Sequence, residues 1–335
     1  RLWVNSGNPF DGMPECSQEL GFDDDGQGRA LVSVDYDQDG DLDVFVCQYY
    51  SKRNLEGETL RGSFPVPFPI QNATNGGPNV LLRNDGGLQF VDASQEAGLA
   101  NDNSRYSFAC LWEDFDNDGD QDLLITYRLA PNKLFRNDSG SFVDVSATCG
   151  INQGARKSYG ACFGDYDKDG FLDLFVANYT SSFDEYAFNE LYHNEGDGTF
   201  EDVTESSGMF EVTGIQSFQG QWVDFNGDNL LDLHVIRDRV IYANHFFEQQ
   251  PEGAITPFIE SANAVGLDMA INCMSTSVAD YDGDLDMDVY ITAFPVDENW
   301  MLVNNDYSFS AVNEDSGEIP MQNMQVDAIC WAGNW

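Results

Sequence analysis

The stretch DFDNDGDQDLLITY, residues 114–127, is the unit on which the rest of this chain is built. Its first nine residues form a short loop in which acidic residues alternate with others around a glycine, Gly119, at position six. Carboxylates occupy positions one, three, five, seven and nine: Asp114, Asp116, Asp118, Asp120 and Asp122. Alternating carboxylates on a curled loop direct hard oxygen atoms inward, which suits Ca²⁺ and its roughly six to eight oxygen ligands. The apolar run LLITY then predicts a β-strand directly after the loop.

The same nine-residue pattern occurs four more times. Its odd-numbered positions are Asp35, Asp37, Asp39, Asp41 and Asp43; Asp165, Asp167, Asp169, Phe171 and Asp173; Asp224, Asn226, Asp228, Leu230 and Asp232; and Asp280, Asp282, Asp284, Asp286 and Asp288. One such loop alone could be a solvated acidic turn, because Asp favours turns. Five aligned loops instead predict about five bound Ca²⁺ ions, which we expect to stabilise the fold rather than to act in catalysis.

Two loops depart from the pattern. The fourth has Asn226 at position three and Asn229 in place of the glycine at six, so we expect its site to be the weakest. The fifth has Leu285 at position six, which leaves the geometry of its turn open. EF-hands are not favoured, because they need a bidentate Glu at position twelve and helices on both sides. Position twelve lies in a β-rich run in every copy: Val46, Ile125, Val176, Val235 and Ile291.

A second block of sequence follows each loop and completes a repeat. It reads NVLLRNDG from Asn79, NKLFRND from Asn132 and NELYHNE from Asn189. Weaker copies cover residues 240–267, with an insert, and 299–319. Asn-Asp-Gly and Gly-Asp-Gly between apolar runs are typical of hairpin turns. With the apolar lead-in before its calcium loop, each repeat therefore predicts four strands.

Four-stranded units repeated every few tens of residues are typical of propeller blades. We therefore predict an all-β fold, a β-propeller of six or seven blades in a single domain over residues 1–335. Its predicted divisions are a partial blade at 1–22, repeats at 23–99, 100–151, 152–209, 210–267 and 268–319, and the start of a further repeat at 320–335. Inserts are expected near residues 51–77, 180–188 and 245–256.

The composition restricts the partners. The chain holds 15 basic and 58 acidic residues, a formal net charge of −43, and its 42% hydrophobic content is ample for a core. Crowded like charges repel, so we expect the metal-free chain to be poorly stable. The strong negative charge argues against nucleic acid and anionic membranes as partners. No apolar run approaches the roughly 18 residues that a membrane span needs, so membrane insertion is not expected.

The calcium loops and the glycosylation sequons favour an extracellular or cell-surface setting. Seven cysteines without a CxxC pair argue against zinc, and we expect buried free thiols. Glycosylation sequons stand at Asn72, Asn137 and Asn178, and Asn137 lies in a turn, RNDSGS, where a glycan would be tolerated. Calcium sites of extracellular modules are weak enough to respond to the millimolar Ca²⁺ outside cells.

These repeats resemble the FG-GAP/VCBS repeats of integrin α-subunit propellers and of many secreted propellers. They are most similar to the cartilage-acidic-protein-like branch, often linked to the ASPIC/UnbV domain, in which LFRN(D/N)G…F-x-D-V-(S/T)…A-G-(L/I) precedes D-x-D-x-D-G-x-x-D. Residues 134–173 match this pattern nearly throughout. The resemblance implies that side chains at positions one, three, five and nine bind Ca²⁺, together with the backbone carbonyl at seven. It does not specify a function, because one propeller fold serves adhesion, sugar binding and catalysis.

Because repetition marks structure, we expect function in the parts that do not repeat. The insert at 51–77 carries Lys52, Arg53 and Arg61 beside the run FPVPFP, and loops on rigid scaffolds commonly bind partners. A loop that only covers a blade edge is equally consistent with this insert. The sequence thus favours a binding or assembly module for protein or glycan partners, self-assembly included, in adhesion, matrix or a surface filament.

The alternative is a propeller-based carbohydrate-active enzyme such as a polysaccharide lyase. The three histidines of this chain offer little for catalysis: His193 occupies a repeat position, His234 lies in a predicted strand and His245 in the predicted third insert.

Overall fold

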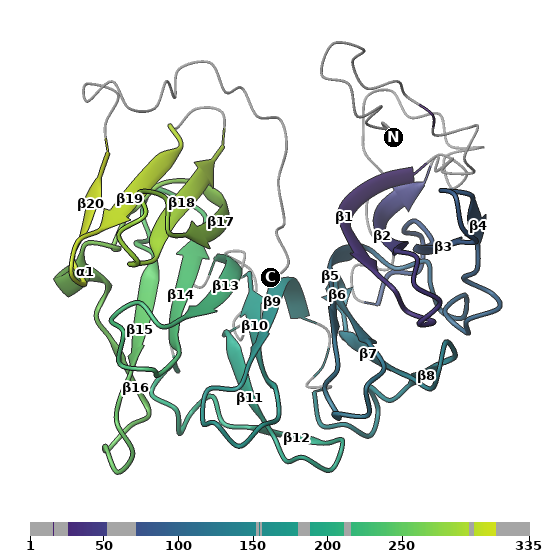
Figure 1. Cartoon of the computed structure of the whole chain (residues 1–335), viewed down its shortest axis with the longest axis horizontal. Helices are drawn as coiled ribbons and strands as arrows, with labels where there is room; N and C mark the ends of the chain where they lie inside the picture. Colours follow the sequence, from purple (N-terminus) through teal and green to yellow (C-terminus); the bar gives the residue numbers. More distant parts are fainter. Residues whose placement is uncertain are drawn as a thin grey trace. The chain divides into compact units, whose positions relative to one another are not determined.

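The computed structural model describes residues 16, 26–51, 72–151, 154, 156–179, 188–210, 216–294 and 298–312. These residues form twenty β-strands and one four-residue helix, so the all-β prediction is confirmed. Successive strands pair antiparallel in groups of four, the arrangement of a propeller blade (Figure 1). No helix in the described residues is long and apolar enough to cross a membrane. The predicted partial repeats at 1–22 and 320–335 lie outside the described residues, apart from Cys16.

The chain divides into two compact units. Unit 1 comprises Arg1–Ala147 and Asn152–Ala155, and unit 2 comprises Thr148–Ile151 and Arg156–Trp335. In unit 1 the strands are β1 Gly26–Val34, β2 Asp43–Ser51, β3 Val80–Asn84, β4 Phe90–Asp92, β5 Ser107–Glu113, β6 Asp122–Ala130, β7 Lys133–Asn137 and β8 Phe142–Asp144. In unit 2 the elements are β9 Arg156–Gly164, β10 Asp173–Asn178, β11 Glu190–Asn194, β12 Phe200–Asp202, β13 Ser217–Val223, β14 Asp232–Arg237, β15 His245–Gln249, β16 Phe258–Glu260, α1 Ala262–Val265, β17 Cys273–Ala279, β18 Asp288–Ala293, β19 Trp300–Asn304 and β20 Phe309–Ala311. A single propeller spanning both units stays a prediction.

The second strand of every group begins at position nine of a predicted calcium loop. The five residues are Asp43, Asp122, Asp173, Asp232 and Asp288. Each loop is therefore the connection between the first and second strands of its blade, as the sequence predicted. Strands, not helices, flank each of these loops, so the EF-hand alternative is wrong.

Large side chains from the strands form the hydrophobic cores between the sheets. Trp112 of β5 packs edge-on against Phe45 of β2, with ring centroids 6.0 Å apart, in the core of unit 1. Trp222 of β13 packs with Phe175 and Phe258 in the core of unit 2. Both tryptophans therefore belong to the core of their blades. The described cysteines form no disulfide with one another, and five of them are buried: Cys47, Cys110, Cys149, Cys162 and Cys273.

The fourth repeat corrects the predicted position of an insert. His245 is not in an insert, because it begins β15, the third strand of its group. The Asn244 side chain accepts a hydrogen bond from the backbone N–H of Arg237 at 2.9 Å, just as Asn132 accepts one from Tyr127 in the second repeat. The third-strand block therefore starts at Asn244. The weak match there, ANHFFEQQ instead of NKLFRND, concealed this strand.

The glycine of the A-G-(L/I) motif allows close contact between neighbouring blades. These glycines, Gly98, Gly150, Gly208 and Gly266, all have φ between +87° and +94°. A Cβ atom on Gly208 would lie 2.5 Å from the carbonyl oxygen of Phe258 in the next blade. That Phe258 in turn donates its N–H to the carbonyl of Ser207 at 3.0 Å. The motif thus lets the turn that ends one blade hydrogen-bond to the outer strand of the next.

Candidate metal centres

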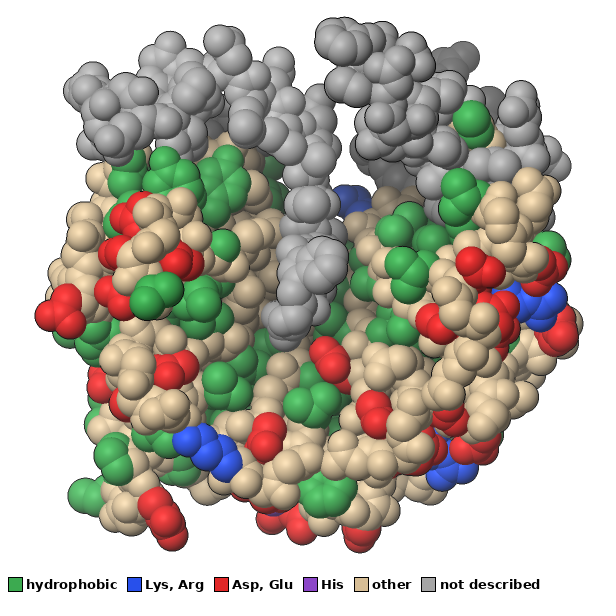
Figure 2. Space-filling model, in the orientation of Figure 1, with side chains coloured by type: hydrophobic (Ala, Val, Ile, Leu, Met, Phe, Trp, Pro, Cys, Tyr) green, Lys and Arg blue, Asp and Glu red, His purple; other side chains and the backbone are tan. Residues whose placement is uncertain are grey.

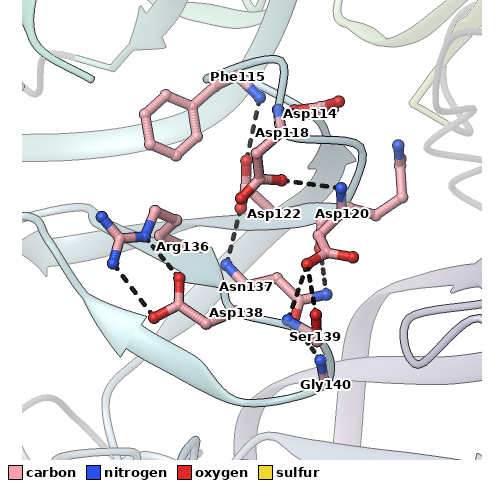
Figure 3. Close-up of polar contacts among 11 residues, drawn as sticks. Asp114, Phe115, Asp118, Asp120, Asp122, Arg136, Asn137, Asp138, Ser139 and Gly140 are labelled. Atoms are coloured by element: carbon pink, nitrogen blue, oxygen red, sulfur yellow. Dashed lines mark hydrogen bonds and ion pairs between the residues drawn. The ribbon is translucent and has the colours of Figure 1, made fainter. Parts of the chain in front are cut away.

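The second loop shows how each predicted metal centre is built (Figure 3). Asp114 at position one accepts backbone N–H groups at both oxygens, from Asp118 at 3.1 Å and from Gly119 at 2.9 Å. These bonds close the loop into a curl, which needs left-handed backbone at positions four and six. Asn117 has a φ of 59° and Gly119 a φ of 93°. The alternation of side chains read from the sequence therefore becomes a ring of oxygens in space.

The aspartate at position nine anchors this curl to the sheet. Asp122 is buried, and its Oδ2 accepts the N–H of Phe115 at 3.0 Å while its Oδ1 accepts the N–H of Asn137 at 2.7 Å (Figure 3). One carboxylate thus connects the loop with the third strand. The other four loops repeat both bonds, through Asp43, Asp173, Asp232 and Asp288.

The side-chain amide at the end of a third strand connects neighbouring loops in both units. Asn137 donates from Nδ2 to the carbonyl of Gln121 in its own loop at 3.1 Å and to that of Tyr36 in the preceding loop at 2.9 Å. In unit 2, Asn304 makes the corresponding bond to Phe225 at 3.1 Å. The loops therefore contribute to cohesion between blades as well as to their own blade.

Carboxylate oxygens converge in four of the five loops. Oxygen or nitrogen atoms lie within 4.8 Å of one another in these groups: Asp35, Asp37 and Asp39; Asp114, Asp116 and Asp122; Asp165, Asp167 and Asp169; Asp167, Asp173 and His193; and Asp280, Asp282 and Asp288. Three buried oxygens in these groups have no hydrogen-bond partner: Oδ1 of Asp37, of Asp116 and of Asp165. A buried acceptor without a donor is costly, and a hard cation would satisfy it. The donor set, carboxylate oxygen at nearly every position, fits Ca²⁺.

Burial and mutual repulsion disfavour the charged form of these carboxyls when no ion is bound. Burial raises the pKa of Asp43 to about 6 and the pKa values of Asp122 and Asp232 to about 7, although backbone N–H bonds oppose the rise. Burial also raises the pKa of Asp116, helped by the charge of neighbouring Asp118. A cation between the carboxylates would reverse this, because opposite charge favours ionisation.

The residue at position seven contributes its side chain to the hairpin rather than to the ring of oxygens. In the second loop, Asp120 Oδ2 accepts a hydrogen bond from the N–H of Ser139 at 2.8 Å (Figure 3), and its Oδ1 accepts one from Nε2 of Gln38 at 2.9 Å. Phe171 and Leu230 at the same position carry no carboxylate at all. This agrees with a ligand at position seven that comes from the backbone carbonyl. Calcium binding by the five sets of residues remains a prediction.

The fourth and fifth loops keep the same curl despite their altered glycines. In both, glycine moves to position four, where Gly227 and Gly283 have φ values of 73° and 82°. Position six stays left-handed without glycine, at Asn229 with φ 66° and Leu285 with φ 81°. The Leu285 N–H still donates to Asp280 at 3.2 Å. The turn geometry left open by the sequence is therefore retained, at the cost of a strained leucine.

Replacing that leucine should stabilise the chain. Leu285 is 86% exposed, so it contributes little packing, while a leucine in left-handed backbone costs about 1–2 kcal/mol. Allowing for the greater freedom of glycine in the unfolded chain, Leu285→Gly should raise the free energy of unfolding by about 0.5–1 kcal/mol. The matched control is Leu42→Gly in the first loop, an exposed leucine outside the left-handed region, which should destabilise. Chemical denaturation of both variants in calcium measures the difference; equal effects would contradict the strain argument.

The sequence interpretation missed one contribution to the third loop. His193 does occupy the position of Arg83 and Arg136, but its Nδ1 lies 3.1 Å from Asp173 Oδ1 and 3.4 Å from Asp167 Oδ2. The charges of these two aspartates raise the pKa of His193 against the opposing effect of its burial. The signal available in the sequence was the replacement of arginine by histidine at this one repeat position.

Two predicted glycosylation sites do not fit the fold. Asn137 is fully buried and its Nδ2 bonds the two loop carbonyls, so the predicted tolerance of a glycan there is wrong. Asn178 is also buried, and its Nδ2 donates to Phe188 at 2.7 Å and to Glu190 at 2.9 Å. Asn72 is exposed, so glycosylation stays a prediction at this sequon.

Comparison with known families identifies the repeat. The model of the FG-GAP-like repeat matches residues 114–176, 165–235 and 224–291, and each match begins at position one of a loop described above. Together the matches cover residues 114–291, more than half of the chain. The chain belongs to the FG-GAP-like repeat family. The resemblance inferred from the loops and the A-G-(L/I) motif is confirmed.

The curated relatives support the same FG-GAP branch. Cartilage acidic protein 1 of Xenopus tropicalis is 25% identical over 308 residues, which is 87% of this chain and 45% of the relative. The proteins of that name from Mus musculus and Homo sapiens are 28% and 30% identical over 47% of this chain and 24% of each relative. The chain thus spans less than half the length of these relatives.

Among solved structures, the FG-GAP chain is similar to the V. cholerae biofilm matrix protein Bap1, with a TM-score of 0.43 and 17% identity over 87% of this chain and 40% of that chain. It is also similar to BBS1N in complex with ARL6DN, with a TM-score of 0.40 and 11% identity over 86% of this chain and 82% of that chain.

Proposed function

We propose that this FG-GAP chain is an extracellular, Ca²⁺-stabilised β-propeller of six or seven blades that serves as a binding or assembly module. Its partners are proteins or glycans of a cell surface or matrix. The observation that carries the proposal is the set of unpartnered buried oxygens on Asp37, Asp116 and Asp165, inside loops that recur at the same place in every blade. A repeated internal ion with a purely structural position suits a scaffold, whose surface loops are free to recognise partners.

The ion binds where loop and blade contacts coincide. Asp122 accepts hydrogen bonds from its own loop, at Phe115, and from Asn137, and Asn137 donates to Tyr36 in the preceding loop. An ion bound in the curl therefore stabilises two blades together. Because the unfolded chain has no preformed site, the binding free energy of each ion becomes folding free energy. Sites of this kind respond to millimolar Ca²⁺, which supports an extracellular location. On the face drawn in Figure 2, acidic side chains prevail over basic ones, which suits an environment rich in divalent cations.

Counting the bound calcium tests this proposal. Native mass spectrometry or equilibrium dialysis in millimolar Ca²⁺ should find about five ions per chain. Asp116→Asn should remove one ion, because it replaces an unpartnered carboxylate oxygen of the second loop. The control is Asp138→Asn, an exposed carboxylate paired with Arg136 outside the loop, which should leave the count unchanged. A chain that binds no calcium, or that loses an ion equally in both variants, overturns the proposal.

A further inference from the structure

The strand ends opposite the calcium loops carry a second repeated arrangement. Near its start, each first strand has a β-bulge, whose residues are Arg29, Phe108, Tyr159, Phe218 and Met274. Six residues after position nine, close to the end of each second strand, stand Tyr49, Arg128, Tyr179, Asp238 and Phe294. The two sets form corresponding clusters in the two units, and the clusters differ in charge.

In unit 1, two guanidinium groups meet on one tyrosine. The Arg29 Cζ atom lies 5.0 Å from the ring centroid of Tyr49 and 5.8 Å from that of Phe108. Arg128 donates from Nη1 to the hydroxyl of the same Tyr49. Arg29, Tyr49, Phe108 and Arg128 are named here the Tyr49 cluster. Two of its four side chains are cationic.

In unit 2, the same four positions carry one acid and form a neutral cluster together with the following residue, Arg239. Tyr179 stacks on Tyr159 with ring centroids 4.8 Å apart, and its hydroxyl donates to Asp238 Oδ2 at 2.8 Å. Phe218 packs edge-on against Tyr179 at 5.6 Å. Arg239 pairs with Asp238 at 3.3 Å and donates to the Tyr179 hydroxyl at 3.2 Å. A carboxylate therefore stands in unit 2 at the position that Arg128 occupies in unit 1.

Arg29 has no acidic partner among the described residues, whereas the cluster in unit 2 contains Asp238. In a chain of net charge −43, Arg83, Arg105 and Arg136 each pair with a nearby Asp. Arg29 forms no ion pair or hydrogen bond with any part of the chain that the structure describes, and its Nε is buried without an acceptor. An unsatisfied buried donor is costly, so a carboxylate from outside the chain would be bound favourably.

We propose that the Tyr49 cluster binds the carboxylate of a uronic-acid sugar. The segment beside it supplies neutral hydrogen-bonding side chains for sugar hydroxyls. Asn72 donates its backbone N–H to Leu129 at 2.7 Å, next to Arg128, and both Asn72 and Thr74 expose their side chains. One acid group with flanking hydroxyls matches this combination better than an acidic peptide side chain does. The inference names a ligand class for the binding module proposed above and rests on that proposal.

Titration with defined sugars tests the site. Methyl glucuronoside would be titrated into the calcium-loaded full chain, prepared without N-glycans, and followed by calorimetry or chemical shift changes. Arg29→Gln should weaken binding about tenfold or more, because it removes a charge-assisted hydrogen bond. Arg128→Asp should abolish binding and keep the fold, since Asp238 occupies the equivalent position beside Tyr179. Methyl glucoside, which lacks the carboxylate, should not bind.

Control measurements separate the outcomes. Arg239→Gln, in the neutral cluster of unit 2, should leave glucuronoside binding unchanged. Acetate and a glutamate peptide should bind more weakly than the glucuronoside; equal or tighter binding of the peptide would overturn the sugar assignment. Equal affinity of wild type and Arg29→Gln would overturn the site itself. These failures would leave the calcium count intact, whereas failure of the proposed scaffold role would appear in that count.

Discussion

Chelation of calcium is expected to lower the melting temperature of this FG-GAP chain by on the order of 10–20 °C. A site with a dissociation constant near 0.1 mM, filled at about 2 mM Ca²⁺, stabilises the folded state by about 2 kcal/mol. Five such sites would contribute up to about 9 kcal/mol, and 1 kcal/mol shifts the melting temperature of a large domain by about 2 °C. The measurement is differential scanning calorimetry in millimolar Ca²⁺ and after EDTA. An unchanged melt in EDTA contradicts structural calcium.

The pH dependence of the chelated chain distinguishes the cost of burying charged carboxylates without an ion from a general effect of EDTA. The folded-state pKa values of Asp43, Asp122 and Asp232, about 6 to 7, lie above the ordinary value near 4. The folded chain therefore binds more protons than the unfolded chain between about pH 4 and 7, so its stability falls as the pH rises through this window. The chelated chain should melt higher at pH 5.5 than at pH 7.5. The calcium-loaded chain should not, because protons then compete with the ion.

The sequence predicted those features that repeat in a short window. The carboxylate spacing located all five loops, because each oxygen of the curl comes from the alternation within nine residues. The same window located the second strands, since position nine is both the last loop residue and the first strand residue, as at Asp122 and Asp173.

Features that depend on neighbouring blades were not predictable in this way. The sequon at Asn137 reads as an exposed turn, because nothing in RNDSGS shows that its amide bonds Tyr36, about a hundred residues away. The strand that begins at His245 was missed because its sequence lacks the LFRN pattern. Its pairing with Val235, which the structure retains, cannot be read from the sequence. Arg128 and Asp238 are recognised as equivalent positions of opposite charge only when the two blades are aligned by the bulges in their first strands. Tertiary contacts, not local propensity, decide these positions.

The substitution Gly208→Ala is expected to destabilise the chain by about 3–5 kcal/mol, or to prevent folding. The residue has a φ of 88°, where alanine costs about 1–2 kcal/mol. Its Cβ would also lie 2.5 Å from the Phe258 carbonyl oxygen and 3.2 Å from the Thr256 Cβ atom, so the backbone of the next blade would have to move. That movement would strain the hydrogen bond from Phe258 to Ser207. Denaturant unfolding in calcium measures the loss.

Gly253→Ala separates the two causes of that loss. Gly253 has nearly the same φ, 90°, but nothing lies within 4 Å of its would-be Cβ atom. It should therefore show only the conformational cost, about 1–2 kcal/mol. Similar losses in the two variants would mean that the blades can separate at the Gly208 turn without penalty. A much larger loss at Gly208 would instead show that contact between backbones of successive blades is what the glycine of the A-G-(L/I) motif provides. Because Gly150 and Gly266 approach Phe200 and Phe309 in the same way, the result would extend to the other turns of unit 2.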